Sequence, residues 1–475
     1  MPLGGAKLRL AKVGIVTAAG LVALVLLLTE PFICPENLPA GMHPAAPQRC
    51  VAVFVFCMAL WFTSFIPLAA TGLLVLALLP LLNVLDERAT LALFGNSAVF
   101  FMLGVFLLAA ATISTGLSKR ITLLALHRFG GSSKRLVTGV TMSAAFLSLW
   151  MPEHAVAAMI YPIVVETVES LQLPKGHNYA RKLFLGLAWG AIIGGVGTFL
   201  GGARAPLALS LLREEHPGVT VSFLGWMVAA LPVVVLAALA AVLGLHRWLR
   251  DDCPEIHSAT VMLRERVRRL GRMSGPERRL AVLALLTVLA WITVGHAVGL
   301  AVIALLSATL LFFLRIVDWK SIQGYVNWGV LVMYGGAVAL GSAVTETGAV
   351  DWLAHRLVPG GIPGFGVLAV LAAVAIMFTE VISNAAAVAI LLPIGLSLGK
   401  LAGLDPVAVT MAVTIPAGLS FMLPISSPPN AISYSAGHYG VQLMARLGVW
   451  MNVVCYIIML ATMWLWWPLL GLRSW

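Results

Sequence analysis

The chain has 475 residues, of which 60% are hydrophobic and 10% are charged. Because soluble domains carry about a quarter charged residues, this composition excludes a soluble globular protein and predicts a chain embedded in a membrane. Lysine and arginine outnumber aspartate and glutamate by 30 to 19, a net charge of +11, but the basic residues lie in loops between apolar runs. Their placement indicates membrane topology rather than binding of nucleic acid.

The first 30 residues combine a basic start with an apolar stretch at residues 13–28. We interpret this stretch as the first transmembrane helix rather than a signal peptide, because no clear cleavage site follows it and many further spans do. The five cysteines form no metal-binding pattern. Cys57 and Cys455 lie in apolar runs. Cys34 lies within a polar loop and Cys50 follows that loop directly, so a disulfide on an oxidising face is one alternative there.

The remaining apolar runs are long and unbroken, whereas barrel strands would show alternating segments of about ten residues. They lie at residues 51–85, 94–117, 136–151, 155–165, 183–203, 219–245, 280–314, 327–344, 357–379, 381–399, 406–436 and 447–470. A span needs about 20 residues, and several runs are shorter and broken by polar residues. We therefore predict an all-α polytopic membrane protein with about 11 transmembrane helices and two re-entrant hairpins.

The basic loops predict the orientation, because loops rich in lysine and arginine stay in the cytoplasm. With the N-terminus inside, segments 118–135 and 246–279 both fall inside, the latter with nine arginines. The basic residues at 175–182 fall inside only if residues 136–171 enter and leave on the same face, as a hairpin does. The loops assigned to the outside are poor in basic residues and lie at 30–49, 86–96 and 213–218.

Two segments of the chain resemble each other in order and spacing. Each contains a Thr-Gly pair, an apolar run, a polar tip and an alanine-rich stretch that ends at a proline. The prolines are Pro162 and Pro393, which are 231 positions apart. With an odd number of crossings between them, the second unit is inverted relative to the first. Inverted repeats with broken helices predict a substrate site near the membrane midplane.

These features divide the chain into five parts. Residues 1–135 form scaffold helices that begin the first repeat, and residues 136–245 form the first hairpin and broken helix of a transport unit. A basic cytoplasmic connector at 246–279 leads to the scaffold helices of the second repeat at 280–360. Residues 361–475 contain the second hairpin, the second broken helix and the last span.

Polar residues break the apolar run of the second hairpin around Ser383 and Asn384. Both residue types favour helix N-caps, but here the cap interrupts a membrane segment, where exposed backbone is tolerated only if it lines a cavity. Carbonyls before such a break can bind a cation, and amides that open the next helix favour an anion. A later break at 424–430 contains two adjacent prolines and predicts a discontinuous helix that faces this tip. We therefore expect Ser383, Asn384, Ser427 and Asn430 to converge.

Ser383-Asn384 before an alanine-rich helix, followed by Ser427-Pro428-Pro429-Asn430, resembles the divalent anion:sodium symporter family of di- and tricarboxylate and sulfate carriers. The resemblance covers nearly the whole chain. It implies a sodium site at each hairpin tip, an anion held between the tips, and a homodimer whose transport domain moves as an elevator. The sodium ligands that it implies are Thr379, Ser383, Asn384 and Ser426. The substrate contacts that it implies are Asn384, Ser427, Pro428 and Asn430.

The first tip departs from the family pattern. Pro152-Glu153-His154 stands where Ser-Asn-Thr is expected, and the broken helix after it contains Arg204 but no Pro-Pro-Asn. Proline and glutamate suit any helix start, but an ionisable residue at the midplane indicates function and needs a partner. We expect Glu153 and Arg204 to pair, or Arg204 to replace the first sodium ion as a fixed cation for an anionic substrate. His154 or Glu153 could instead take up a proton.

Together these features predict a secondary active transporter of the inner membrane that carries a small divalent anion. The leading substrate is a dicarboxylate, and its transport is coupled to sodium through the second tip. The open alternative is a proton-coupled or exchange-type carrier of another anion, such as sulfate or citrate, in which Glu153, His154 and Arg204 replace the first sodium site. An enzyme is disfavoured because no metal-ligand spacing or nucleophile–base set is present. A channel is disfavoured because hairpins and inverted repeats are transporter features. The expected partners are the anion, membrane lipids and a second copy of the chain, without nucleic acid.

Overall fold

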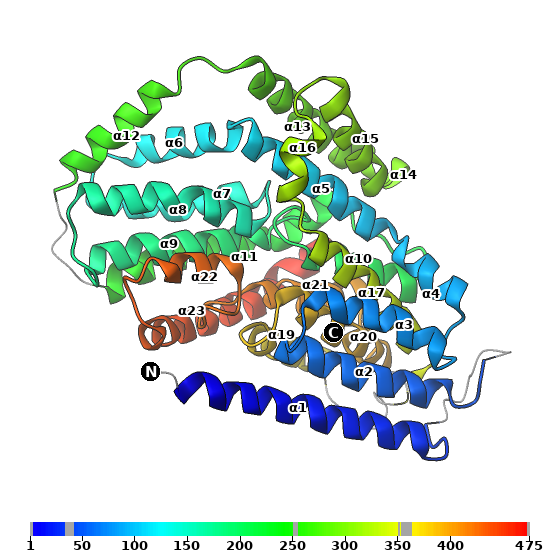
Figure 1. Ribbon diagram of the computed structural model, residues 1–475. Helices are drawn as coiled ribbons and strands as arrows, with labels where there is room; N and C mark the ends of the chain where they lie inside the picture. The colour runs from blue at the N-terminus through cyan, green and yellow to red at the C-terminus, as the bar shows by residue number, and fades with distance from the viewer. Residues whose placement is uncertain (1–2, 34–41, 250–254, 350–351, 353–362, 473–475) are drawn as a thin grey trace.

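The computed structural model describes residues 3–33, 42–249, 255–349, 352 and 363–472, and within them it contains helices, turns and loops but no strand. Figure 1 shows the arrangement of the helices. Those of the first half are α1 (Leu3–Leu28), α2 (Ala46–Thr63), α3 (Leu68–Leu81), α4 (Glu87–Phe94), α5 (Ser97–Ser114), α6 (Leu117–Phe129), α7 (Ser133–Ser148), α8 (Glu153–Ser170), α9 (Asn178–Gly195), α10 (Arg204–Glu215) and α11 (Phe223–Trp248). Those of the second half are α12 (His257–Arg269), α13 (Gly275–Thr293), α14 (Gly295–Val298), α15 (Leu300–Phe313), α16 (Trp319–Ile322), η1 (Gln323–Tyr325), α17 (Trp328–Glu346), α19 (Gly364–Thr379), α20 (Asn384–Leu401), α21 (Pro406–Thr414), η2 (Pro416–Gly418), α22 (Pro428–Ser435), α23 (Val441–Ala461), η3 (Thr462–Trp466) and η4 (Trp467–Leu470).

Seven helices of the described part have the length and apolar composition needed to cross a membrane. Four shorter apolar helices accompany them, at Leu68–Leu81, Leu300–Phe313, Gly364–Thr379 and Pro406–Gly418. The expected all-helical membrane fold is therefore confirmed, whereas the expected number of spans stays a prediction.

The apolar stretch near the N-terminus lies in α1, which packs against α2 and leaves most of its surface exposed. Gln48 of α2 is buried and donates to the carbonyl oxygen of Leu26 at 2.7 Å, which ties the end of α1 to α2. Cys50 is buried in the same helix, whereas Cys34 lies outside the described residues.

Both predicted hairpins break at equivalent positions. In the first, α7 ends at Ser148 and α8 begins at Glu153, and in the second, α19 ends at Thr379 and α20 begins at Asn384. Each pair of ends is separated by the 231 positions that separate the repeats. Pro152 precedes α8, where its fixed backbone favours a helix start, and the Ser383 side chain caps α20.

A broken helix follows each hairpin. In the first repeat α9 ends at Gly195 and α10 begins at Arg204, and in the second an unwound segment at 419–427 separates η2 from α22. Pro428 opens α22, because proline fits the first helical position, where an amide would have no partner within the helix.

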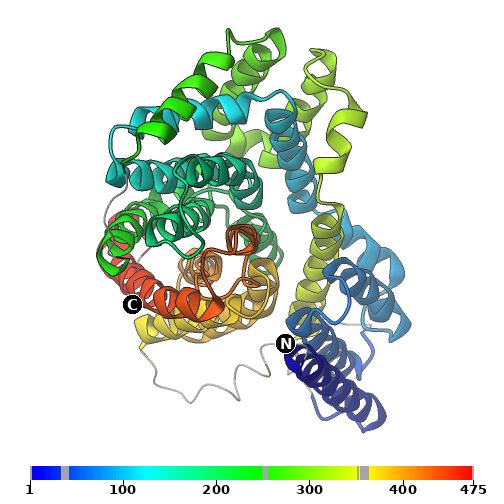
Figure 2. The same ribbon diagram turned by 60° about the vertical axis from the view of Figure 1, so that its left-hand side comes forward.

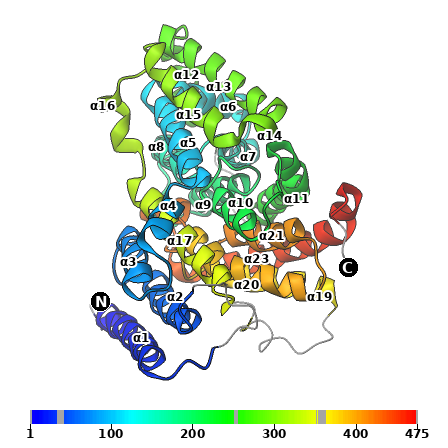
Figure 3. The same cartoon turned by 90° about the vertical axis from the view of Figure 1, so that its right-hand side faces the viewer.

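The helices form two groups, which Figure 2 separates clearly. Helices α7–α11 and α19–α23 form a rounded assembly, which we call the bundle, and α1–α5 with α15–α17 form a second group beside it, which we call the column. Helices α6, α12 and α13 lie across one end of both groups. Figure 3 shows α17 between α3 and α20, and α17 packs against both. The two hairpin tips lie inside the bundle.

Candidate functional site

A buried ion pair joins the first hairpin to the broken helix that follows it. Nη1 of Arg204 lies 3.2 Å from Oε2 of Glu153, and the two side chains are only 3% and 7% exposed. Glu153 is the first residue of α8, where a carboxylate is favoured by the helix dipole. Arg204 is the first residue of α10, where a cation is disfavoured. Arg204 is therefore placed against the local helix preference, and Glu153 offsets this cost.

The guanidinium group of Arg204 fills space that two glycines leave open. A Cβ atom added to Gly195 would collide with the carboxylate of Glu153, and one added to Gly418 would collide with the guanidinium group. Gly195 ends α9 and Gly418 ends η2, so Arg204 reaches from the first broken helix to the second. Its Nη2 atom is buried and has no hydrogen-bond partner among the described residues. A buried, unpaired cationic donor is costly, and it offers a binding point for an anionic group.

The two hairpin tips touch each other through equivalent residues. Nδ2 of Asn384 lies 3.4 Å from Oε1 of Glu153. Each residue is the first of the second helix of its hairpin, and the separation between them is that of the repeats. The internal symmetry of the chain therefore brings the starts of α8 and α20 together in the bundle.

Three oxygen atoms of the second repeat lie close together beside this contact. The hydroxyl oxygen of Thr379 is 2.7 Å from Oδ1 of Asn384 and 2.6 Å from the carbonyl oxygen of Ala417. The Asn384 amino group faces the Glu153 carboxylate, so its oxygen must face Thr379. A hydroxyl has one proton and can donate to only one of the two oxygens at a time. We call this group of Thr379, Asn384 and Ala417 oxygens the oxygen cluster; oxygens are the atoms that bind hard cations.

Over most of its length, the chain is similar to a known family of membrane transporters. The family described as the sodium:sulfate symporter transmembrane region matches residues 16–473 of the chain. The chain belongs to this family.

Relatives of this sodium:sulfate symporter family member include the sodium-dependent dicarboxylate transporter SdcS of Staphylococcus aureus, which is 28% identical over 468 residues. The alignment covers 92% of this chain and 88% of SdcS. The expected family resemblance is thereby confirmed. The family and this relative are transporters rather than enzymes.

Two solved transporter structures share the fold. MtrF of Neisseria gonorrhoeae, described with a class of antimetabolite efflux pumps, superimposes with a TM-score of 0.56 at 13% identity, covering 97% of this chain and 94% of MtrF. The YdaH transporter of Alcanivorax borkumensis gives a TM-score of 0.50 at 17% identity, covering 86% of this chain and 98% of its own. At these identities the likeness extends to the fold alone.

In this symporter-family chain, Ser383 and Asn430 of the second repeat form hydrogen bonds outside the oxygen cluster. The Ser383 hydroxyl accepts a hydrogen bond from the amide of Ala386 at 3.3 Å, as an ordinary cap does. The Asn430 amide donates to the Ser420 carbonyl at 2.9 Å and to the Ser426 hydroxyl at 3.0 Å. Asn430 and Asn384 share no hydrogen bond among the described residues, and the unwound segment links them indirectly.

Ser427 and Pro428 stand at the start of α22. The Ser427 hydroxyl is buried and has no hydrogen-bond partner within the described part of the chain. Pro428 and Pro429 have no amide hydrogen, so a group bound at Ser427 would meet the Asn430 amide as the first donor of α22.

His154 follows Glu153 on α8 but faces away from Arg204. Its ring packs edge-on against Phe106 of α5, with ring centroids 6.5 Å apart. His154 lines a crevice of about 460 Å³ between α8 and the helices α5, α6 and α12. Lys119 also lines this crevice, as do Glu166 and Arg266, which form an ion pair between α8 and α12. The crevice lies on the predicted cytoplasmic side.

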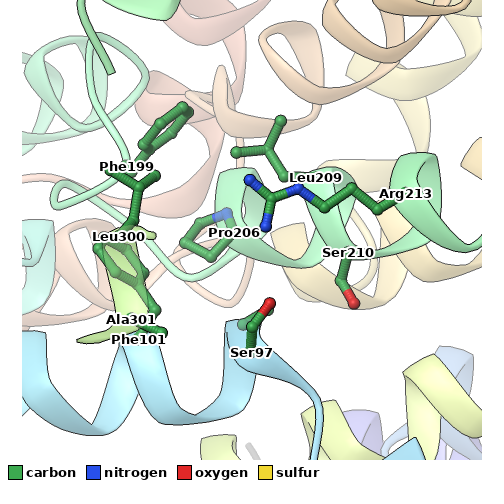
Figure 4. Close-up of a pocket in the computed structure, with 10 residues that line it drawn as sticks. Ser97, Phe101, Phe199, Pro206, Leu209, Ser210, Arg213, Leu300 and Ala301 are labelled. Carbon is green, nitrogen blue, oxygen red and sulfur yellow. The ribbon is translucent and has the colours of Figure 1, made fainter. Parts of the chain in front are cut away.

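A much smaller cavity lies on the predicted outer side. Figure 4 shows Ser210 and Arg213 of α10 on one side of it and Ser97 and Phe101 of α5 on the other. Its volume is about 30 Å³, which suffices for water but is far below the roughly 300–1,000 Å³ of small-molecule pockets. Of these two cavities, the one on the predicted cytoplasmic side is the larger.

Two contributors to the site were not predicted from the sequence. Ala417 contributes through its backbone carbonyl, and a carbonyl leaves no signal in the residue type. Glu380 lies at the second tip and is 4% exposed. It could have been found by the rule that singled out Glu153, since an ionisable residue at the membrane midplane indicates a role.

Proposed function

We propose that this chain is a secondary active transporter that couples the movement of sodium ions to that of a small dicarboxylate across the plasma membrane. The observation that carries the proposal is the direct contact between the residues of a cation site and those of an anion site. Asn384 belongs to the oxygen cluster and touches Glu153, which in turn holds Arg204. Two sites in contact can favour being filled together, which symport requires.

Sodium would bind at the oxygen cluster. Carbonyls at the C-terminal ends of half-helices coordinate sodium in transporters with broken helices, and Ala417 lies in η2, directly before the unwound segment of the second broken helix. Thr379 and Asn384 would supply side-chain oxygens. The hydroxyls of Ser383 and Ser426 already have partners, so we assign both residues a supporting role in this cation site.

The anion would bind at Arg204 and at the start of α22. The free Nη2 of Arg204 suits one carboxylate of the substrate. The unpaired Ser427 hydroxyl and the Asn430 amide, the first amide of α22 after two prolines, suit the other carboxylate. In this proposal the guanidinium group replaces the sodium ion of the first tip, and Asn430 shapes the site by holding the unwound segment.

The proposed movement follows the family resemblance. The bundle would carry the site past the column as an elevator, within a homodimer in the plasma membrane. The crevice of about 460 Å³ opens between α8 of the bundle and α5 of the column, two helices that this movement would shift past each other.

Proton coupling is the competing proposal, and the ion pair between Arg204 and Glu153 favours it. When a substrate carboxylate binds Arg204, the Glu153 carboxylate loses its cation and could accept a proton. Purified protein in liposomes would separate the two. Labelled succinate should accumulate under an inward sodium gradient and not under a potassium gradient of equal size. Uptake driven by a proton gradient without sodium would replace the sodium proposal, and faster uptake of citrate or sulfate would change the substrate class.

A further inference from the structure

Glu380 is a buried carboxylate that the proposed transport mechanism does not use. Its Oε1 accepts hydrogen bonds from the Phe421 amide at 2.7 Å and from Nδ2 of Asn452 at 2.7 Å, and its Oε2 accepts one from the Met422 amide at 3.0 Å. No lysine or arginine of the described residues forms an ion pair with it. These donors together offset the cost of placing a carboxylate inside the bundle.

The residues that Glu380 holds belong to the unwound segment between η2 and α22. Phe421 and Met422 have no helical partners for their amides, and such groups must be satisfied inside a membrane. Helix α23 closes the segment from another side. A Cβ atom added to Gly448 of α23 would lie 2.5 Å from the Phe421 carbonyl oxygen, so the contact requires glycine. The segment is therefore clamped between the second tip and α23.

We infer that Glu380 is a positioning residue for the proposed sodium site. It follows Thr379 directly, so the tip that supplies the hydroxyl ligand also supplies the clamp. The clamped segment continues back through Ser420 to Ala417, which supplies the carbonyl ligand. Glu380 thus fixes the distance between two of the three oxygens of the oxygen cluster. The inference rests on the proposed function, because it assumes that sodium binds at this cluster.

The first repeat supports a role beyond ordinary hairpin structure. The position equivalent to Glu380 is Leu149, which has no polar side chain. There the Thr198 hydroxyl of the unwound segment donates to the Leu149 carbonyl at 2.6 Å. A backbone carbonyl is therefore sufficient to tie a tip to its segment. The carboxylate clamp is present in the repeat that has the oxygen cluster. The first repeat has neither, and its tip pairs with Arg204 instead.

The test is the sodium dependence of succinate uptake by Glu380→Gln in liposomes. The glutamine keeps the shape but has one acceptor oxygen and no charge. We expect the sodium concentration for half-maximal uptake to rise about tenfold, the loss of one charged hydrogen bond. The maximal rate and the succinate KM at saturating sodium should stay within about twofold of wild type, because Arg204 and Ser427 are unchanged. Glu346→Gln is the control for loss of a carboxylate as such, since Glu346 is an exposed carboxylate at the C-terminal end of α17.

Gly448→Ala probes the same clamp without touching the carboxylate, and it should also weaken the sodium response. It decides the question if Glu380→Gln does not reach the membrane. An unchanged sodium response in either correctly inserted variant would overturn the inference. Equal losses in maximal rate and sodium response would also overturn it, because they would indicate a general structural role. A wild-type protein that transports succinate without sodium would instead contradict the proposed function.

Discussion

The two hairpin tips occupy equivalent positions in the bundle but carry different chemistry. At the first tip, the side chains of Glu153 and Arg204 form a charged pair. At the second tip, Thr379 and Asn384 present uncharged oxygens. The repeat therefore preserves where the chain breaks and where the helices begin, while the residues at the breaks differ. One tip contains its own cation, and we propose that the oxygens of the other bind an external one.

Replacement of Arg204 should have the largest effect on this asymmetry. In Arg204→Ala, Glu153 stays buried without its cation, and breaking a buried pair costs about 3–5 kcal/mol. We expect succinate uptake per inserted protein to fall by at least about 100-fold. Arg213→Ala is the control, because Arg213 lies on the same helix near its exposed end. Wild-type uptake by Arg204→Ala would remove the arginine from the proposed site.

Neutralising both partners should show whether the pair serves structure or substrate. The double variant Glu153→Gln with Arg204→Gln leaves no buried charge, so we expect it to insert and purify better than either single variant. Its uptake should nevertheless stay as low as that of Arg204→Ala, because the proposed carboxylate ligand is absent. Recovery of transport in the double variant would mean that the pair is structural. Uptake assays and size-exclusion profiles of all three variants give the answer.

Removal of the Thr379 hydroxyl should affect sodium rather than the anion. Thr379→Val loses one of three oxygens of the oxygen cluster. We expect the sodium concentration for half-maximal uptake to rise about tenfold, comparable to the loss of one charged interaction. Ser148→Ala is the matched control, because Ser148 is the equivalent residue at the first tip and its hydroxyl is buried without a partner in the described part. Equal changes in both variants would contradict the difference between the tips.

His154 should give the smallest effect. Its ring packs on Phe106 and lines the crevice rather than meeting Arg204. We expect His154→Ala to change the uptake rate less than about twofold and to leave its pH dependence unchanged between pH 5.5 and 8, roughly the range of histidine titration. Loss of a pH-dependent component in uptake measured over this range would favour histidine-linked proton coupling instead.

The sequence was sufficient for the features that residue type and spacing encode. The broken apolar runs predicted both hairpins, and the cost of charge in a membrane predicted the pairing of Glu153 with Arg204. Glu153 and Asn384 are also equivalent by the repeat spacing, but we did not predict from the sequence that they would touch. Backbone contributions were beyond reach, since the Ala417 carbonyl is independent of its side chain.

The direction in which a side chain points was the other feature that the sequence could not supply. His154 adjoins Glu153 in the chain, but successive residues of a helix point about 100° apart, so the two face different surroundings. Asn430 was expected to converge with Asn384, and this stays a prediction. The sequence did not give its partners: the Asn430 amide donates to the Ser420 carbonyl and to the Ser426 hydroxyl of the unwound segment.

The glycines around Arg204 have a consequence for how such a site can arise. The guanidinium group fits only because position 195 in one repeat and position 418 in the other both lack a side chain. An arginine introduced at the corresponding place in a relative with larger residues there would be sterically blocked. An arginine at this place therefore depends on glycines in segments more than 200 residues apart along the chain. Transfer of the arginine to another chain requires the three positions to be changed together.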